Sequence, residues 1–149
     1  MQKSFDTPKI VTIEKIVDET PTVRTLFFSD ETLSKVLPGQ FAMVWIPGVD
    51  EIPMSVMISH ENGKAAFTVR THGPATTELF SKNVGDQIGI RGPYGNSFTI
   101  KQGKLLLVGG GTGLVPRSFC VACWPSAFQT LESIRLPRVS NWSGSRHVQ

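Results

Sequence analysis

The first hundred residues alternate between short apolar segments and turn signals, a pattern typical of a small β-barrel or sandwich. Pro38-Gly39 and Pro47–Asp50 mark turns, and Asn62-Gly63 is a strong hairpin signal. Five segments rich in β-branched or alternating apolar residues predict strands: Ile10–Val17, Thr22–Phe28, Gln40–Ile46, Met54–Ile58 and Lys64–Arg70. The pattern predicts a mainly β domain.

The spacing of apolar residues changes beyond these strands. Residues 76–82 (TTELFSK) predict one or two helical turns, with a threonine as N-cap and Leu79 and Phe80 as apolar anchors. Gln87–Arg91 predicts the last strand of the domain. Lys104–Val108 is continuously apolar and leads into a glycine-rich turn, which is typical of a strand buried on both faces at the start of a parallel α/β sheet. We therefore place a domain boundary near residues 98–103.

Residues 117–149 differ in composition from the rest of the chain. They hold four arginines, no lysine and one glutamate, and so supply the whole formal charge of +3, because residues 1–116 hold eleven basic and eleven acidic residues. A basic face on a folded domain is therefore not indicated, and we expect no nucleic-acid partner. Cys120 and Cys123 lie here without a second pair, so a chance pair is favoured over a metal site. We interpret residues 117–149 as an aberrant or disordered tail.

Nothing in the sequence indicates a membrane. The apolar runs are all shorter than the roughly 18 residues that cross a bilayer, and the N-terminal MQKSFDTPK lacks the profile of a signal peptide. We expect a cytoplasmic protein.

Four segments could carry chemistry: Glu51–Ser55, Arg70–Thr76, Gly92–Phe98 and Leu107–Pro116. In the second, Gly73 permits close approach of a ligand, and the amides that open the following helix form an anion site. A capped helix start without a ligand is the alternative. The fourth segment has neither the spacing of a dinucleotide fingerprint nor the lysine of a P-loop, so a tight packing turn is its alternative interpretation.

The order of these segments is more informative than any one of them. A strand with xPxS, GxxT opening a helix, GDxIxIRGPYGxxF and LLLVGGGTGxxP together resemble the ferredoxin-reductase-like flavoproteins, and most of all the electron-transfer subunits of NAD-linked dihydroorotate dehydrogenases. The resemblance covers about residues 7–116. It implies a six-stranded antiparallel Greek-key FAD-binding barrel with one short helix (residues 1–100), followed by the first βα piece of a Rossmann-like NAD-binding domain (residues 101–116).

The resemblance also implies a set of cofactor-binding residues, and no catalytic acid or base, because the flavin carries the chemistry. Position 52 departs from the family, which usually has an arginine there. Its loss removes a charge-assisted phosphate contact of about 1.5–3 kcal/mol, for which Arg70 could compensate. FAD contacts would fall to Ile52, Pro53, Met54, Ser55, Thr68, Val69, Arg70, Gly73, Ala75 and Thr76, and NAD(P) contacts to Gly109, Gly110, Gly111, Thr112 and Gly113.

The implied function is that of an FAD-dependent subunit passing electrons between a partner dehydrogenase and NAD(P). In this family the partner carries FMN and oxidises dihydroorotate in pyrimidine biosynthesis, so we expect a hetero-oligomer. A ferredoxin–NADP or sulfide dehydrogenase-type reductase subunit is the alternative within the superfamily. A barrel that holds no flavin and serves only for docking is the alternative from another class.

Residues 117–149 also bear on the second cofactor. A nicotinamide domain needs on the order of 100 residues beyond Pro116, and Cys120 and Cys123 do not match the late four-cysteine [2Fe–2S] motif of the dihydroorotate branch. We therefore expect weakened or lost NAD(P) binding and no cluster, and hypothesise out-of-frame translation of an interrupted gene. If neither other reading frame beyond codon 116 encodes a helix–strand continuation, a genuine short paralogue is the better account.

Overall fold

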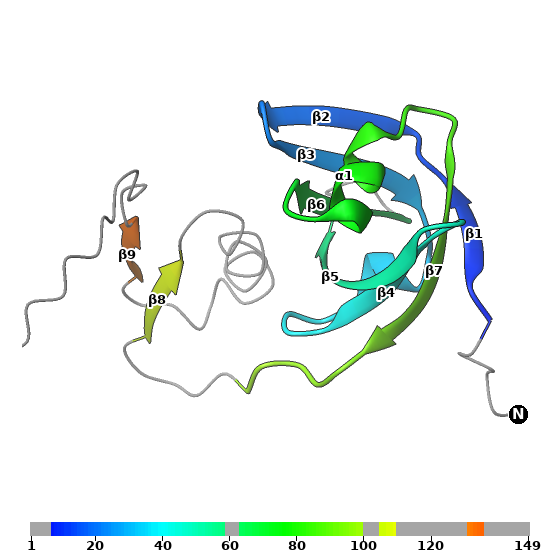
Figure 1. Ribbon diagram of the computed structural model, residues 1–149. Coiled ribbons are helices and arrows are strands. Elements are labelled where there is room, and N and C mark those ends of the chain that lie inside the picture. Colours follow the sequence, from blue (N-terminus) through cyan, green and yellow to red (C-terminus); the bar gives the residue numbers. More distant parts are fainter. Residues whose placement is uncertain (1–6, 59–62, 100–104, 110–130, 136–149) are drawn as a thin grey trace, which may run out of the picture.

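The computed structural model describes residues 7–58, 63–99, 105–109 and 131–135 of the chain, which form two separate sheets (Figure 1). The larger sheet has the strand order β1-β7-β4-β5-β6-β3-β2, and every pairing in it is antiparallel. Its strands are β1 (Lys9–Thr12), β2 (Lys15–Thr20), β3 (Val23–Ser29), β4 (Phe41–Ile46), β5 (Asp50–Ile58), β6 (Lys64–Arg70) and β7 (Gln87–Tyr94).

The barrel closes because β1 and β2 act as one strand that changes partner. β1 pairs with β7 and β2 pairs with β3. At the junction the Ile13 N–H donates to the Asp86 carbonyl at 2.9 Å, the Gly85 N–H donates to the Ile13 carbonyl at 2.8 Å, and the Glu14 N–H donates to the Phe27 carbonyl at 2.8 Å. The predicted six-stranded antiparallel barrel is confirmed. The single strand expected at residues 10–17 is two strands instead.

The barrel interior is filled by alternate side chains of the strands. Phe28 and Phe67 stack there with their ring centroids 5.0 Å apart. Burying one such large apolar side chain stabilises the fold by roughly 1.5–3 kcal/mol. The largest side chains below 2% exposure are Phe28, Phe67, Ile13, Leu26, Leu33, Ile46, Leu79, Ile88, Val44, Val56 and Val69.

Two short helices pack on this barrel. The 3₁₀ helix η1 (Leu33–Lys35), which the sequence pattern did not predict, follows β3 and contacts β5 and β6. Helix α1 (Pro74–Ser81) follows β6 and contacts β6, β4 and β5, and its Leu79 side chain is fully buried in the core. Figure 1 shows α1 lying beside β6. Within the part of the chain that the structure describes, no helix is long and apolar enough to cross a membrane.

The smaller sheet consists of β8 (Leu105–Gly109) and β9 (Leu131–Arg135), paired in parallel from Leu105↔Leu131 to Gly109↔Arg135. β8 is the strand expected at residues 104–108, displaced by one residue. A parallel pair requires a crossover connection, as in an α/β domain. β9 lies in residues 117–149, where no strand was expected. The rest of that range lies outside the described residues.

Candidate functional site

β5 changes partner halfway along its length, and this opens a gap in the pairing beside β6. Its first half pairs with β4, from Asp50↔Ile46 to Ser55↔Phe41, whereas Val56–Ile58 pair with β6. The last residues of β6, 68–70, pair with β3 alone. We call the two facing edges, residues 52–55 and 68–70, the β5–β6 split. Backbone N–H and C=O groups on such edges are available to a ligand.

The β5 edge of the split is divided between the core and the surface. Pro53 and Ser55 are exposed, while Ile52 and Met54 are half-buried and pack against the hydrophobic core. At position 52, where the resemblance implies an arginine, this chain therefore has a side chain that stabilises the barrel. Proline is tolerated at position 53 because this half of β5 has an unpaired edge.

The β6 edge combines two side chains held by the barrel with one that is exposed. The Thr25 hydroxyl donates to Glu19 Oε1 at 2.9 Å and lies 3.0 Å from the Thr68 hydroxyl. Because the Thr25 proton goes to Glu19, Thr68 donates to Thr25. Val69 is fully buried. Both side chains shape the edge rather than extend from it.

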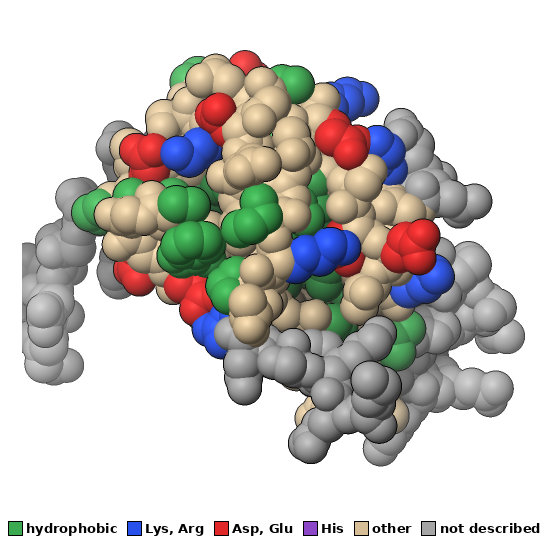
Figure 2. All heavy atoms as spheres, turned by 90° about the vertical axis from the view of Figure 1, so that its right-hand side faces the viewer, with side chains coloured by type: hydrophobic (Ala, Val, Ile, Leu, Met, Phe, Trp, Pro, Cys, Tyr) green, Lys and Arg blue, Asp and Glu red, His purple; other side chains and the backbone are tan. Residues whose placement is uncertain are grey.

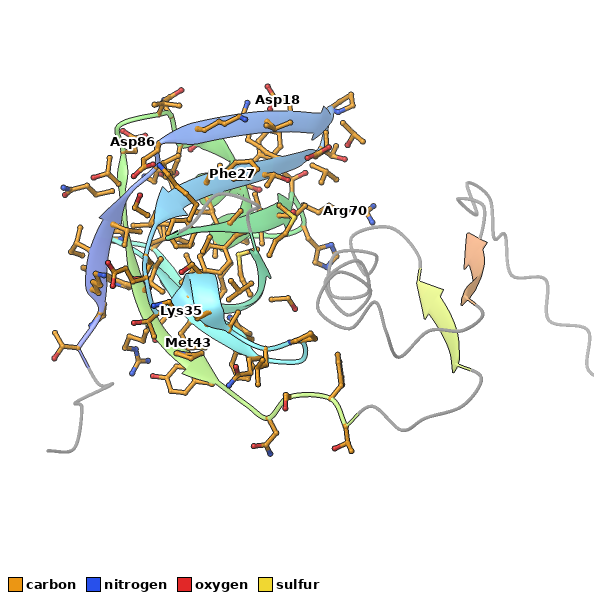
Figure 3. The ribbon with its side chains drawn as sticks, turned by 180° about the vertical axis from the view of Figure 1, so that it is seen from behind. Asp18, Phe27, Lys35, Met43, Arg70 and Asp86 are labelled. Carbon is orange, nitrogen blue, oxygen red and sulfur yellow. The ribbon has the colours of Figure 1, made fainter. Side chains whose placement is uncertain are left out.

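Arg70 ends β6 with an exposed side chain. Figure 3 shows it extending away from the barrel. In the described ranges Arg24 pairs with Asp18 and Arg91 pairs with Glu51, whereas Arg70 has no ion pair. Its guanidinium is therefore available to an anion from solvent, unlike those of the two other arginines of the described barrel.

The N-cap of α1 lies three residues beyond Arg70. Gly73, not a threonine, is the N-cap, so the sequence-based expectation of a threonine cap is wrong. Thr76 occupies the third helical position. Its hydroxyl accepts from the N–H groups of His72 at 2.9 Å and Gly73 at 3.0 Å, and donates to the Gly73 carbonyl at 3.0 Å. The side chain of Thr76 thus fixes the turn into the helix.

The first turn of α1 offers backbone donors. The amides of Ala75 and Thr76 have no acceptor within the helix, since the first N–H groups of any helix precede its hydrogen-bond ladder. The helix dipole adds a partial positive charge there. A Cβ on Gly73 would meet no described atom within 4 Å. Its φ of −149° is extended backbone that any residue adopts, so the absent side chain leaves open space rather than relieving strain.

A carboxylate beside the split is neutralised within the barrel. Arg91 Nε on β7 donates to Glu51 Oε1 at 2.7 Å, and Arg91 Nη2 also donates to Glu51 Oε2. The hydrogen bonds and charge of Arg91 hold the pKa of Glu51 below its usual value. This pair was missed by sequence reasoning because its members are far apart in the chain. It reduces the negative charge that β5 presents beside Ile52.

The GPYG motif shapes the end of β7. Gly92 has a φ of +134° and precedes a cis peptide bond to Pro93. A Cβ on Gly92 would lie 3.3 Å from the Phe41 carbonyl oxygen, and one on Gly95 would lie 3.2 Å from the Phe41 ring. The Tyr94 ring centroid lies 5.9 Å from that of Phe41. These glycines allow β7 to pack closely on β4.

Only the first residue of the predicted nicotinamide-binding turn lies within the described residues. Gly109 is the last residue of β8, whereas Gly110, Gly111, Thr112 and Gly113 lie outside the described residues, as do Cys120 and Cys123. The ten predicted FAD contacts all lie within the described part: seven are in the β5–β6 split, and Gly73, Ala75 and Thr76 follow it at the start of α1.

No family model matches the chain. Curated proteins do: the chain is 46% identical over 109 residues to a probable dihydroorotate dehydrogenase B (NAD+) electron transfer subunit from Methanocella arvoryzae, with 73% of this chain and 40% of that protein covered. A protein of the same name from Thermoplasma volcanium is 46% identical over 103 residues, with coverages of 69% and 40%. The chain thus spans about two-fifths of the length of these relatives.

Solved structures show the same fold. An NADH-dependent reduced ferredoxin–NADP oxidoreductase, described for flavin-based electron bifurcation, is 27% identical with a TM-score of 0.76, covering 85% of this chain and 48% of that one. A flavohemoglobin from Malassezia yamatoensis with bound FAD and heme is 18% identical with a TM-score of 0.71, covering 87% and 37%. The barrel therefore has the ferredoxin-reductase-like fold, and the predicted resemblance to dihydroorotate dehydrogenase electron-transfer subunits is confirmed.

Proposed function

We propose that this chain is the FAD-binding part of an electron-transfer subunit of an NAD-dependent dihydroorotate dehydrogenase. The observation that carries the proposal is the β5–β6 split, which leads directly into the open N-terminal turn of α1 and has the unpaired Arg70 between them. Bound there, FAD would supply the capacity to exchange electrons with both a nicotinamide and a partner centre.

The residues of the split and of α1 have different tasks in this proposal. Pro53, Ser55 and the unpaired backbone edges contact the flavin ring, with Met54, Thr68 and Val69 shaping the surface behind them. The pyrophosphate is bound by Arg70 and by the amides of Ala75 and Thr76. Ile52 contributes no charge, so Arg70 replaces the family's usual arginine. These groups fit a dianionic ligand because they offer a guanidinium and two free amides at a helix N-terminus.

The names of the relatives, electron transfer subunits of an NAD(+)-dependent dihydroorotate dehydrogenase, support a catalytic partner subunit and a nicotinamide as second cofactor. We place the chain in a hetero-oligomer with an FMN-containing subunit that oxidises dihydroorotate, and assign Gly109–Gly113 as the residues that would contact NAD(P). A ferredoxin–NADP type of reductase subunit is the second candidate, favoured by the 27% identity to the bifurcating oxidoreductase. Co-purification with a dihydroorotate dehydrogenase catalytic subunit, rather than with a ferredoxin-linked one, would favour the first.

Flavin binding is tested directly on the purified chain. Titration with FAD, followed by absorbance and by equilibrium dialysis, should show saturable binding with a shifted flavin spectrum. A colourless chain that takes up no added FAD contradicts the proposal and favours the flavin-free docking module.

The role of Arg70 is tested by Arg70→Met. Loss of a charge-assisted contact of about 1.5–3 kcal/mol corresponds to roughly ten- to hundredfold weaker FAD binding, with little change in thermal stability because the side chain is exposed. Lys35→Met is the matched control: it removes a positive charge that is also exposed, from η1. Equal effects of the two variants would indicate only a general loss of charge.

A further inference from the structure

Arg24 connects the barrel to the C-terminal end of α1. From β3, its Nε donates to Asp18 Oδ1 on β2 at 2.6 Å. Its Nη1 donates to the Phe80 carbonyl at 2.5 Å and to the Lys82 carbonyl at 3.4 Å. The guanidinium carbon also lies 4.3 Å from the centroid of the Phe80 ring. One side chain therefore contacts β2 and both the backbone and a ring of the helix.

These contacts satisfy carbonyl groups at the C-terminal end of α1. The last carbonyls of a helix have no partner within it, and a cation there interacts favourably with the helix dipole. α1 has eight residues and no basic residue in its own last turn, so Arg24 supplies the cation from another element. Stacking on Phe80 while bonding to its carbonyl also fixes the helix about its axis. A planar guanidinium can do both at once, whereas a lysine ammonium cannot.

The strand that carries Arg24 also borders the β5–β6 split. In the β3–β6 register Arg24 lies opposite Val69, and Val23 lies opposite Arg70. Arg70 and Gly73 are three residues apart, so the strand end and the helix start are joined by a short connection. Because Arg24 attaches the C-terminal end of α1 to β3, it also determines the position of the first turn of α1 relative to Arg70.

We propose that Arg24 is a positioning residue for the phosphate-binding end of α1. It holds the helix so that the amides of Ala75 and Thr76 and the guanidinium of Arg70 act on the same anion. This inference rests on the proposed flavin function. It assigns the effect of Arg24 to the phosphate groups of the ligand and not to the flavin ring, because Arg24 bonds the C-terminal end of α1 and not the β5–β6 split.

The test compares two flavins on the full chain by equilibrium dialysis with protein in excess. Riboflavin is the probe without phosphate and FAD is the probe with it. We expect Arg24→Met to weaken FAD binding about tenfold and to change riboflavin binding less than twofold. Arg24→Lys keeps the charge and one donor, and should weaken FAD binding about threefold. Lys82→Met removes a neighbouring charge that bonds Glu78 at 2.8 Å and no helix carbonyl, and should leave both affinities unchanged.

Other results would overturn the inference. Equal weakening of FAD and riboflavin would mean a general structural role. If Arg24→Met does not fold, Arg24→Lys decides alone, and unchanged FAD affinity in that variant overturns the inference. A wild-type chain that binds no FAD would instead overturn the proposed function itself, a result distinguishable from FAD binding that is insensitive to position 24.

Discussion

At the scale of single residues, Asp30 is the buried carboxylate on which several segments converge. Its Oδ1 accepts from the backbone N–H groups of Thr32 at 2.9 Å and Leu33 at 2.8 Å, and its Oδ2 accepts from Lys9 Nζ at 2.8 Å. Burial raises its pKa, but Lys9 and the two N–H groups outweigh burial and hold the pKa below its usual value. Because Lys9 lies on β1, a short-range sequence pattern could not identify this contact.

The pH dependence of stability should report this group. Since the folded-state pKa of Asp30 is lowered, its stabilisation is present above the unfolded-state value of about 3.9 and is lost as the pH falls through the folded-state value. Asp30→Asn keeps one acceptor but loses the ion pair, and should cost about 1–2 kcal/mol at pH 7. Urea unfolding of both chains between pH 7 and pH 3 should show the difference shrinking with acidification. A constant difference would contradict the assignment.

Two glycines should respond to a methyl group in opposite ways. A Cβ on Gly89 would lie 2.6 Å from Trp45 Cε3 and 3.1 Å from Pro8 Cβ, so Gly89→Ala should destabilise the fold by about 1–3 kcal/mol through overpacking and leave FAD affinity unchanged. Gly73→Ala should keep or slightly raise stability, because open space and an extended φ accept the methyl. It should nevertheless weaken FAD binding several-fold. Thermal melts and FAD titrations of both variants check this, and similar behaviour of the two would contradict it.

At the scale of elements, the sequence predicted strands best where one partner served the whole strand. β6 was predicted residue for residue, and its pairing with β3 is continuous. β1–β2 and β5 were predicted with wrong limits because each changes partner. In β5, Pro53 follows residues that resemble a turn, yet the unpaired edge allows the strand to begin at Asp50. The limits of such strands depend on pairing between distant segments, which local strand propensity does not predict.

The candidate site was likewise predictable in its motifs but not in its long-range contacts. Its residues were predicted from the order of the motifs. In the structure the two edges of the β5–β6 split face each other, and the start of α1 follows the β6 edge. What sequence did not reveal are the contacts that support them: Arg24 with α1, Glu51 with Arg91, and Thr25 with Thr68. Each joins segments tens of residues apart, with no fixed spacing to identify it.

Helix α1 depends on one buried anchor. Leu79 is 0% exposed within the barrel core, and deleting a buried leucine to alanine costs about 3–5 kcal/mol when the cavity cannot collapse. Leu79→Ala should therefore lower stability by about 3 kcal/mol and weaken FAD binding, because the helix loses its fixed position. Val84→Ala, at a side chain that is 60% exposed, is the control and should change neither the unfolding free energy nor FAD affinity. A fully stable Leu79→Ala chain would show that α1 is not anchored in this way.

At the scale of the whole molecule, the barrel contains everything that its closure requires. The buried core residues of the described chain run from Val11 to Ile90, and β8 and β9 pair only with each other. A barrel also removes the open sheet edges that would otherwise need covering. Folding and the proposed flavin site should therefore be properties of the barrel alone.

A fragment of residues 7–99 tests this independence. We expect it to unfold in one cooperative transition, with a urea midpoint close to that of the barrel in the full chain, since no core residue is removed. FAD affinity should agree within about threefold, because every predicted FAD contact lies in residues 52–76. Circular dichroism during urea unfolding and FAD titration of both chains supply the comparison. Since the pairing of β1 with β7 and of β2 with β3 is complete within the fragment, a loss of cooperativity would mean that later residues stabilise the barrel. A stable fragment that no longer binds FAD would instead place part of the flavin site beyond residue 99.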